Sequence, residues 1–171
     1  MDFLTPRRLL CALLLALAVF SPAAAQSREY KLKAAFIYNF IKFIEWPSQT
    51  GAIKVGILGE DPFKGELKKL ERKKVGGRPL QVSKLGGLGD AKSYQVVFAT
   101  DPAQAAKLVK AVEGKPVLTI SDAPEFTQNG GGIALTSSRN RIRFSINKKT
   151  LERARLKASS KLLGLAAELH G

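Results

Sequence analysis

A run of apolar residues that leads into an aspartate–proline pair occurs twice in this chain. The first run, Ile53–Leu58, reaches Asp61-Pro62 through a short turn, and the second, Gln95–Ala99, reaches Asp101-Pro102. Aspartate caps helix N-termini and proline is favoured at the first helical position, so each run predicts a strand followed by a helix. Continuous apolar strands that alternate with helices predict an α/β fold, a mostly parallel sheet with helices on both faces.

Other segments extend this pattern along the chain. Shorter runs predict strands at Leu80–Ser83 and at Pro116–Ile120. Two strands, Gly132–Thr136 and Arg141–Ile146, predict a C-terminal antiparallel hairpin at one side of the sheet. The predicted helices are 62–72, 103–112, one that Asn147 caps, and a last one that Ser159 or Ser160 caps, with an apolar stripe of Leu162, Leu163, Leu165, Ala166 and Leu169.

The segment from Glu29 to Glu45 predicts a long and largely buried helix. Its apolar residues recur at helical spacing and therefore share one side. The arc is wider than a surface helix needs, so we expect cover from more than one direction. Trp46-Pro47 ends the helix, because the residue before proline is pushed out of the helical region. The apolar residues are Leu32, Phe36, Ile37, Phe40, Ile41, Phe43 and Ile44.

The first 25 residues have the layout of a secretory signal peptide. Arg7-Arg8 precedes an apolar run from Leu9 to Phe20, and the segment closes with Ala23–Ala25. The apolar run is shorter than the roughly 20 residues that a membrane-spanning helix needs. We therefore expect export to the periplasm, cleavage after Ala25, no later membrane insertion, and one mature α/β domain over 26–171.

The chain is strongly basic, with 28 Lys+Arg against 14 Asp+Glu and a formal charge of +14. Cleavage after Ala25 would remove Asp2, Arg7 and Arg8 and so lower this charge by one. A basic protein suits polyanions, but an exported one meets acidic protein surfaces rather than nucleic acid. We expect no nucleic-acid partner.

Thiol, histidine and metal chemistry have few residues to draw on. The one cysteine, Cys11, lies in the predicted leader, and the one histidine is His170. No pair of carboxylates is spaced to share a helix face beside an apolar pocket, as acid–base catalysis would require. The sequence therefore predicts no enzyme, no cofactor and no metal site.

The turns that follow two predicted strands are the candidate ligand site. Ligands of open α/β sheets bind beyond the carboxyl ends of the strands, next to helix N-termini. Gly59 and Asp61 follow the first strand, and Ser121 and Asp122 follow Pro116–Ile120. These residues would form the rim of a pocket, and helix capping is the alternative for the first turn. The glycine clusters elsewhere lack a P-loop signature and are interpreted as turns.

Two groups of cations are candidates for docking on an anionic partner. Arg139, Arg141 and Arg143 alternate with apolar residues, so a strand would direct them to one side. A solvated face is the alternative for this pattern. The second group surrounds the last predicted helix, where core packing is the alternative for the leucines; it comprises Arg155, Lys157, Lys161 and Leu163.

Several segments in order resemble the YfiR family of bacterial periplasmic proteins. The resemblance covers about 29–167, nearly the whole predicted mature chain. The segments that carry it are Ala34–Pro47, Val55–Phe63, Gly130–Ile133, Ile142–Asn147 and Leu156–Leu163.

The resemblance implies a non-catalytic periplasmic regulator. Proteins of the YfiR type bind the periplasmic sensory domain of an inner-membrane diguanylate cyclase and inhibit it, which lowers cyclic di-GMP and biofilm formation. The family is known for homodimers and for cysteines tied to redox-sensitive folding. This chain would keep no cysteine after cleavage, so thiol-based control is not expected. The alternative is a periplasmic small-molecule binding module of a sensing or transport system.

Overall fold

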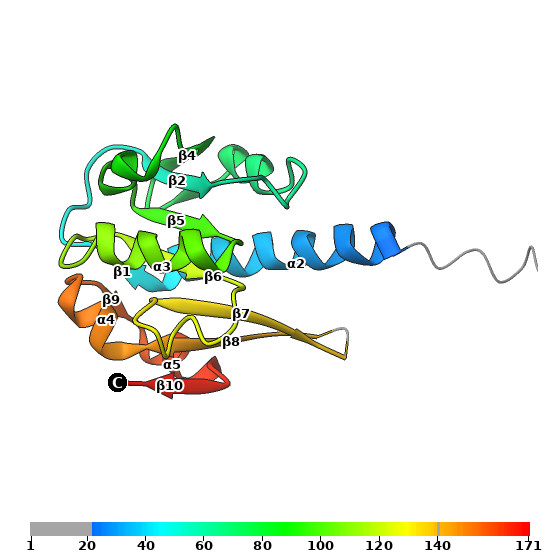
Figure 1. The fold of residues 1–171 in the computed structure, drawn as a ribbon. Coiled ribbons are helices and arrows are strands. Elements are labelled where there is room, and N and C mark those ends of the chain that lie inside the picture. Colours follow the sequence, from blue (N-terminus) through cyan, green and yellow to red (C-terminus); the bar gives the residue numbers. More distant parts are fainter. Residues whose placement is uncertain (1–21, 140) are drawn as a thin grey trace, which may run out of the picture.

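The computed structural model describes residues 22–139 and 141–171, so most of the predicted leader lies outside the described residues. Eight strands form one sheet in the order β10-β8-β7-β6-β5-β2-β4-β3 (Figure 1). The five central strands, from β4 to β7, run parallel, whereas β8 is antiparallel to β7 and β3 is antiparallel to β4. The strands are β2 (Ile53–Leu58), β3 (Lys74–Val75), β4 (Arg78–Lys84), β5 (Val96–Ala99), β6 (Leu118–Ser121), β7 (Ile133–Ser138), β8 (Arg141–Asn147) and β10 (Glu168–His170).

Helices cover both faces of this sheet, as the sequence predicts. Helix α2 (Pro22–Phe43) lies on one face, and α3 (Pro102–Ala111) lies on the other (Figure 1). The buried residues of β5 divide between the two layers: Val96 and Phe98 face the core under α2, while Val97 and Ala99 face the core under α3. A strand buried on both faces explains why these runs are continuously apolar.

The larger core lies between α2 and the sheet and is rich in aromatic rings. Phe40 is fully buried, and its ring centroid lies 5.0 Å from that of Phe144 on β8. Toward the other end of the core, Phe63 contacts both Tyr30 and Phe98, with ring centroids 5.4 and 4.8 Å apart. These edge-to-face contacts fix how α2 lies across the strands.

The predicted cap of α3 is confirmed, but the predicted helix over 62–72 is wrong. Asp101 accepts a hydrogen bond from Gln104 N at 2.8 Å, and α3 begins at Pro102. Asp61 instead accepts a hydrogen bond from Phe63 N in a tight turn. This turn directs the Phe63 side chain into the core, where it is buried. Positive φ angles at Lys64 (48°) and Gly65 (86°) prevent a helix there, and only the short 3-10 helix η2 (Leu67–Arg72) follows.

The C-terminal segment differs from the predicted long helix. The predicted caps are confirmed: Asn147 caps α4 (Lys148–Arg153) and Ser159 caps α5 (Ser160–Leu165). However, α5 ends at Leu165, and the next residues become β10, which pairs in parallel with β8. Pairing at the open edge of β8 overrides the helical pattern, because it satisfies backbone groups that would otherwise be unpaired. Leu165 and Leu169 are consequently exposed.

The long N-terminal helix also differs from its predicted bounds. It ends at Phe43, and Ile44–Glu45 form β1, which pairs antiparallel with β9 (Lys157–Ala158). Leu32 is exposed, whereas the aromatic and isoleucine positions pack against the core. Among the described residues, no helix combines the length and apolar character needed to cross a membrane. A further 3-10 helix, η3 (Leu88–Ser93), was not predicted.

Candidate partner surface and strand-end cavity

A buried ion cluster joins α2 to the carboxyl end of β6. Lys33 Nζ lies 2.6 Å from Asp122 Oδ2 and 2.7 Å from Glu29 Oε1. Tyr30 Oη donates to the same Asp122 oxygen at 2.8 Å, and the lysine also lies over the Tyr30 ring. Lys33 is only 3% exposed, so its charge depends on these partners for stabilisation. Asp122, a predicted rim residue, is therefore committed to a structural contact.

This cluster raises the pKa of Tyr30 well above its ordinary value of about 10. Burial is the largest cause, because it disfavours the phenolate. The hydrogen bond to Asp122 and the negative charges of Asp122 and Glu29 act in the same direction. Tyr30 consequently keeps its proton in the folded protein at pH values where an unfolded chain would lose it.

We expect Tyr30→Phe to reduce the loss of stability in alkali. A raised pKa in the folded state contributes stability that is present below the unfolded pKa and is lost as the pH rises above it. Between pH 10 and 11 the wild type should lose about 1 kcal/mol more than Tyr30→Phe, measured by urea unfolding at each pH. Tyr38→Phe, on the outer side of the same helix, is the control. Equal losses in the wild type and Tyr30→Phe would contradict the expectation.

The other predicted rim residues are placed in different surroundings. Ser121 is buried, and its hydroxyl donates to Ala99 O at 2.6 Å and accepts from Ala123 N at 3.0 Å. Asp61 shapes the turn before Phe63. Of the four predicted residues, Gly59 lines the cavity described next, and the other three do not line it.

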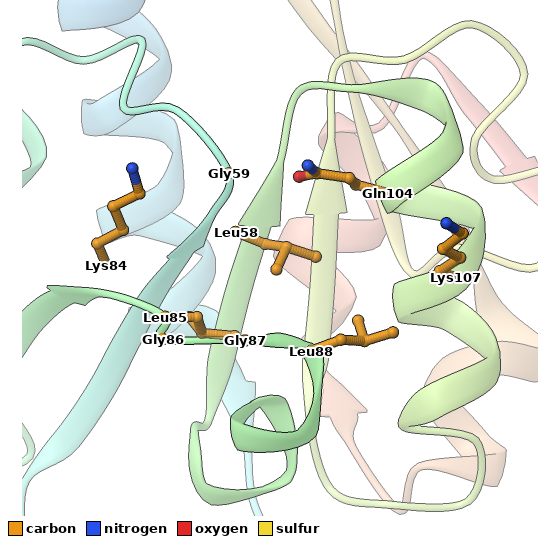
Figure 2. Close-up of a pocket in the computed structure, with 9 residues that line it drawn as sticks. All are labelled: Leu58, Gly59, Lys84, Leu85, Gly86, Gly87, Leu88, Gln104 and Lys107. Atoms are coloured by element: carbon orange, nitrogen blue, oxygen red, sulfur yellow. The ribbon is translucent and has the colours of Figure 1, made fainter.

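The cavity lies at the carboxyl ends of β2 and β4, on the sheet face that α3 covers (Figure 2). Its volume is about 360 Å³. Gly59 and the Gly86-Gly87 loop border it from the strands, and Gln104 borders it from α3. Lys84 and Lys107 lie on its two sides, and both are exposed. A cavity thus lies beyond the carboxyl ends of the strands, where the sequence predicts a ligand site. It lies beside Gly59 and not beside the Ser121–Asp122 turn.

Three lysines lie around two aromatic rings on the opposite face of the sheet. Lys42 Nζ lies 5.7 Å from the ring centroids of both Tyr38 and Phe43. Lys73 lies 4.8 Å from the Tyr38 ring, and Lys161 lies 5.3 Å from the Phe43 ring. Both rings are half-buried, so their outer parts remain at the surface with the ammonium groups. We call these five residues the basic–aromatic surface.

Lys161 connects this surface with the predicted C-terminal candidates. It lies on α5, which contacts the end of α2, and Ser159 N donates to Phe43 O at 2.9 Å. Lys157 is exposed on β9 opposite Glu45, and Arg155 is exposed just before it. Leu163 is half-buried and packs against the main core, so part of its side chain serves packing.

The arginine group lies apart from the basic–aromatic surface. Phe144 and Ile146 of β8 face the core under α2. Because side chains alternate along a strand, Arg141 and Arg143 project from the other face of the sheet. Both are exposed, as is Arg139 in the turn before β8. The two predicted groups of cations therefore cannot contact one flat partner surface together.

The residues of the basic–aromatic surface that sequence reasoning missed come from two separate segments. Tyr38 and Lys42 are four positions apart on α2, a spacing that could have suggested a local pair. Lys73 follows η2 and, like the predicted Lys161 on α5, reaches a ring of α2 only through the tertiary fold. No local pattern contains that information.

The fold is of the α/β class, with a mostly parallel sheet covered by helices on both faces. Among the described residues, no group of three or more histidine, cysteine or carboxylate side chains is arranged to hold a metal ion. The chain belongs to the YfiR/HmsC-like family, whose model matches residues 30–167. This match confirms the family resemblance. A search of curated proteins finds no match.

Solved structures share the fold at low sequence identity. One is a conserved domain protein from Vibrio cholerae O1 biovar El Tor, with a TM-score of 0.53 and 11% identity. Another is an ABC domain from Streptococcus pneumoniae in complex with L-Trp, with a TM-score of 0.54 and 10% identity. Each comparison covers 82% of this chain, which spans 60% of the length of either protein. At this identity the likeness supports the α/β fold alone.

Proposed function

We propose that this protein is a periplasmic regulator without catalytic activity of its own. In this role it binds the periplasmic sensory domain of an inner-membrane diguanylate cyclase and inhibits it, which lowers cyclic di-GMP and biofilm formation. Membership of the YfiR/HmsC-like family supports the role. A homodimer, as the resemblance implies, belongs to the same proposal and is testable by sedimentation of the mature protein.

Export with cleavage after Ala25 is part of this proposal. Helix α2 continues across that position, but residues 23–28 are exposed. Loss of residues 23–25 would therefore remove none of the described core side chains. N-terminal sequencing of the periplasmic fraction tests the site, and a protein that kept Met1 in the cytoplasm would contradict the proposal.

The basic–aromatic surface is the observation that carries the docking proposal. Lysines placed over aromatic rings combine attraction to carboxylates with apolar contact area, a composition found at protein interfaces. The net charge of the chain is strongly positive, so an acidic partner would be attracted from a distance. Lys157 and Arg155 extend the same basic region toward β9.

We expect the double variant Lys157→Glu with Lys161→Glu to bind the membrane partner at least about tenfold more weakly at low salt while folding normally. Both side chains are exposed, so reversal should leave packing intact and act on association. Capture of the cyclase from solubilised membranes measures the effect. Lys110→Glu with Lys115→Glu, a pair of exposed lysines outside this surface, is the matched control. If the test variant captured the cyclase as well as the wild type does, this surface would not be the docking site. The next candidates would be Arg139, Arg141 and Arg143.

The second candidate function is a periplasmic small-molecule binding module of a sensing or transport system. The strand-end cavity favours it, because ligands of open α/β sheets bind at this edge. Gene neighbourhood discriminates the two functions: an adjacent membrane cyclase gene supports the regulator, and an adjacent transporter gene supports the module.

A further inference from the structure

We infer that the strand-end cavity binds a small organic anion that carries both an apolar part and an N–H or O–H donor. The inference rests on the lining of the cavity and does not depend on the docking proposal. Since α3 covers this face and the basic–aromatic surface lies beside α2 on the other, the cavity and the docking surface can be tested separately.

The charge of the lining selects an anion. The cavity is bordered by Lys84 on one side and Lys107 on the other, and no carboxylate is among its lining residues. Within the described part of the chain, neither lysine forms an ion pair. The neighbouring carboxylate of Asp90 accepts a hydrogen bond from Gly87 N at 3.2 Å, so it is directed to its own loop. The lysines are thus free to bind a carboxylate or phosphate group.

The rest of the lining suits an apolar part of modest size. Leu58, Leu85 and Leu88 border the cavity, and Figure 2 shows their side chains between the strands and α3. Gly87 has open space where a side chain would project. A volume of about 360 Å³ falls at the lower end of the range for small-molecule sites. The cavity is therefore large enough for a compact ligand with a branched or ring-shaped apolar group.

Gln104 accounts for the donor in the proposed ligand. Its Oε1 atom is buried and has no hydrogen-bond partner among the described residues. The carboxamide extends from α3 toward the Gly59 turn, so close that a Cβ atom on Gly59 would lie 2.4 Å from Oε1. A buried acceptor without a partner is costly, and rotation of the carboxamide toward a ligand N–H or O–H in the cavity would remove that cost.

The experiment uses two anionic probes, each with a neutral counterpart. N-acetyl-L-leucine carries a carboxylate, an N–H donor and an apolar branch, and N-acetyl-L-leucinamide replaces the carboxylate with a neutral carboxamide. Phenyl phosphate and phenol make the corresponding pair for a phosphate, so the two pairs separate carboxylate from phosphate recognition. Titration followed by backbone amide NMR of the mature protein should shift the signals of Gly59, Gly86 and Gly87 with N-acetyl-L-leucine. Phenyl phosphate, which as the dianion has no donor, should bind more weakly. A dissociation constant on the order of 1 mM is expected for ligands of this size.

Two variants of cavity residues test whether the anionic probes bind in the strand-end cavity. Lys107→Gln should weaken binding of the effective anion about tenfold, whereas Lys110→Gln, one turn along the same exposed helix face, should leave it unchanged. Gln104→Leu should weaken N-acetyl-L-leucine more than phenyl phosphate, which has no N–H donor.

Three outcomes would overturn the inference. The first is that N-acetyl-L-leucine does not shift the three glycine signals. The second is that a neutral counterpart binds as tightly as its anion. The third is that inorganic phosphate alone reproduces the binding, which would reduce the site to general attraction by surface lysines.

Discussion

Replacement of Phe40 by alanine should lower the free energy of unfolding by about 3–5 kcal/mol. The Phe40 ring is fully buried at the centre of the larger core and packs against Phe144 on β8. Its centroid lies 6.1 Å from that of Phe36 on the same helix. The loss combines the apolar area removed with the cavity left behind, because neighbouring rings on two rigid elements relax only partly. Chemical denaturation of the mature protein measures it.

Leu32→Ala is the matched control for that experiment. Leu32 lies on the same helix, but 43% of it is exposed, so its truncation should cost less than about 1 kcal/mol. A loss below about 1 kcal/mol for Phe40→Ala would mean that this side of α2 is not core. A domain whose stability lies near the lower end of the typical range, about 5 kcal/mol, would be left only marginally folded by the expected loss.

Asp122→Ala should destabilise the protein by about 3 kcal/mol. The change leaves the buried Lys33 ammonium with Glu29 as its remaining carboxylate and deprives the Tyr30 hydroxyl of its acceptor. A buried lysine that loses the more buried of its two carboxylate partners costs more than that ion pair contributed, so the single replacement should be worse than the double one. Urea titration of both variants checks this.

The double variant Lys33→Met with Asp122→Ala provides the second half of the test. Removing both charges should recover at least about 1 kcal/mol relative to Asp122→Ala, because no buried ion then lacks its partner. Glu113→Ala, which removes an exposed carboxylate, should be nearly neutral. If the double variant were less stable than Asp122→Ala, the cluster would contribute net stability beyond compensation of the lysine.

Local chemistry predicted those parts of the fold that depend on neighbouring residues. Asp101, Asn147 and Ser159 cap the helices that their positions predict, since a cap needs only backbone groups two or three residues away. Asp61 followed by proline has the same signature, yet it begins a turn. Burial of Phe63 against distant rings decided that segment, and no window around Asp61 contains those rings.

The candidate site was less accessible to sequence reasoning for the same reason. A strand-end position was predictable from the α/β pattern, and Gly59 lies at the cavity. Asp122 occupies an equivalent position in sequence, but Lys33 on α2 reaches it, which only the packing of α2 across the sheet determines. Lys73 and Tyr38 likewise meet through tertiary structure.

The two-residue pairing of β1 with β9 has a consequence for how the chain acquires its fold. It joins the end of the first described helix to a strand near the other end of the chain, and Ser159 N donates to Phe43 O beside it. Residues 44–45 are synthesised long before residues 157–158. The β1–β9 pairing therefore cannot form until residues 157–158 have been synthesised. Until then the apolar side of α2 is not covered by β8 and α5. Contacts between segments so distant in sequence form slowly. We therefore expect the exposed apolar side of α2 to be the part most prone to aggregation before β8 and α5 have formed.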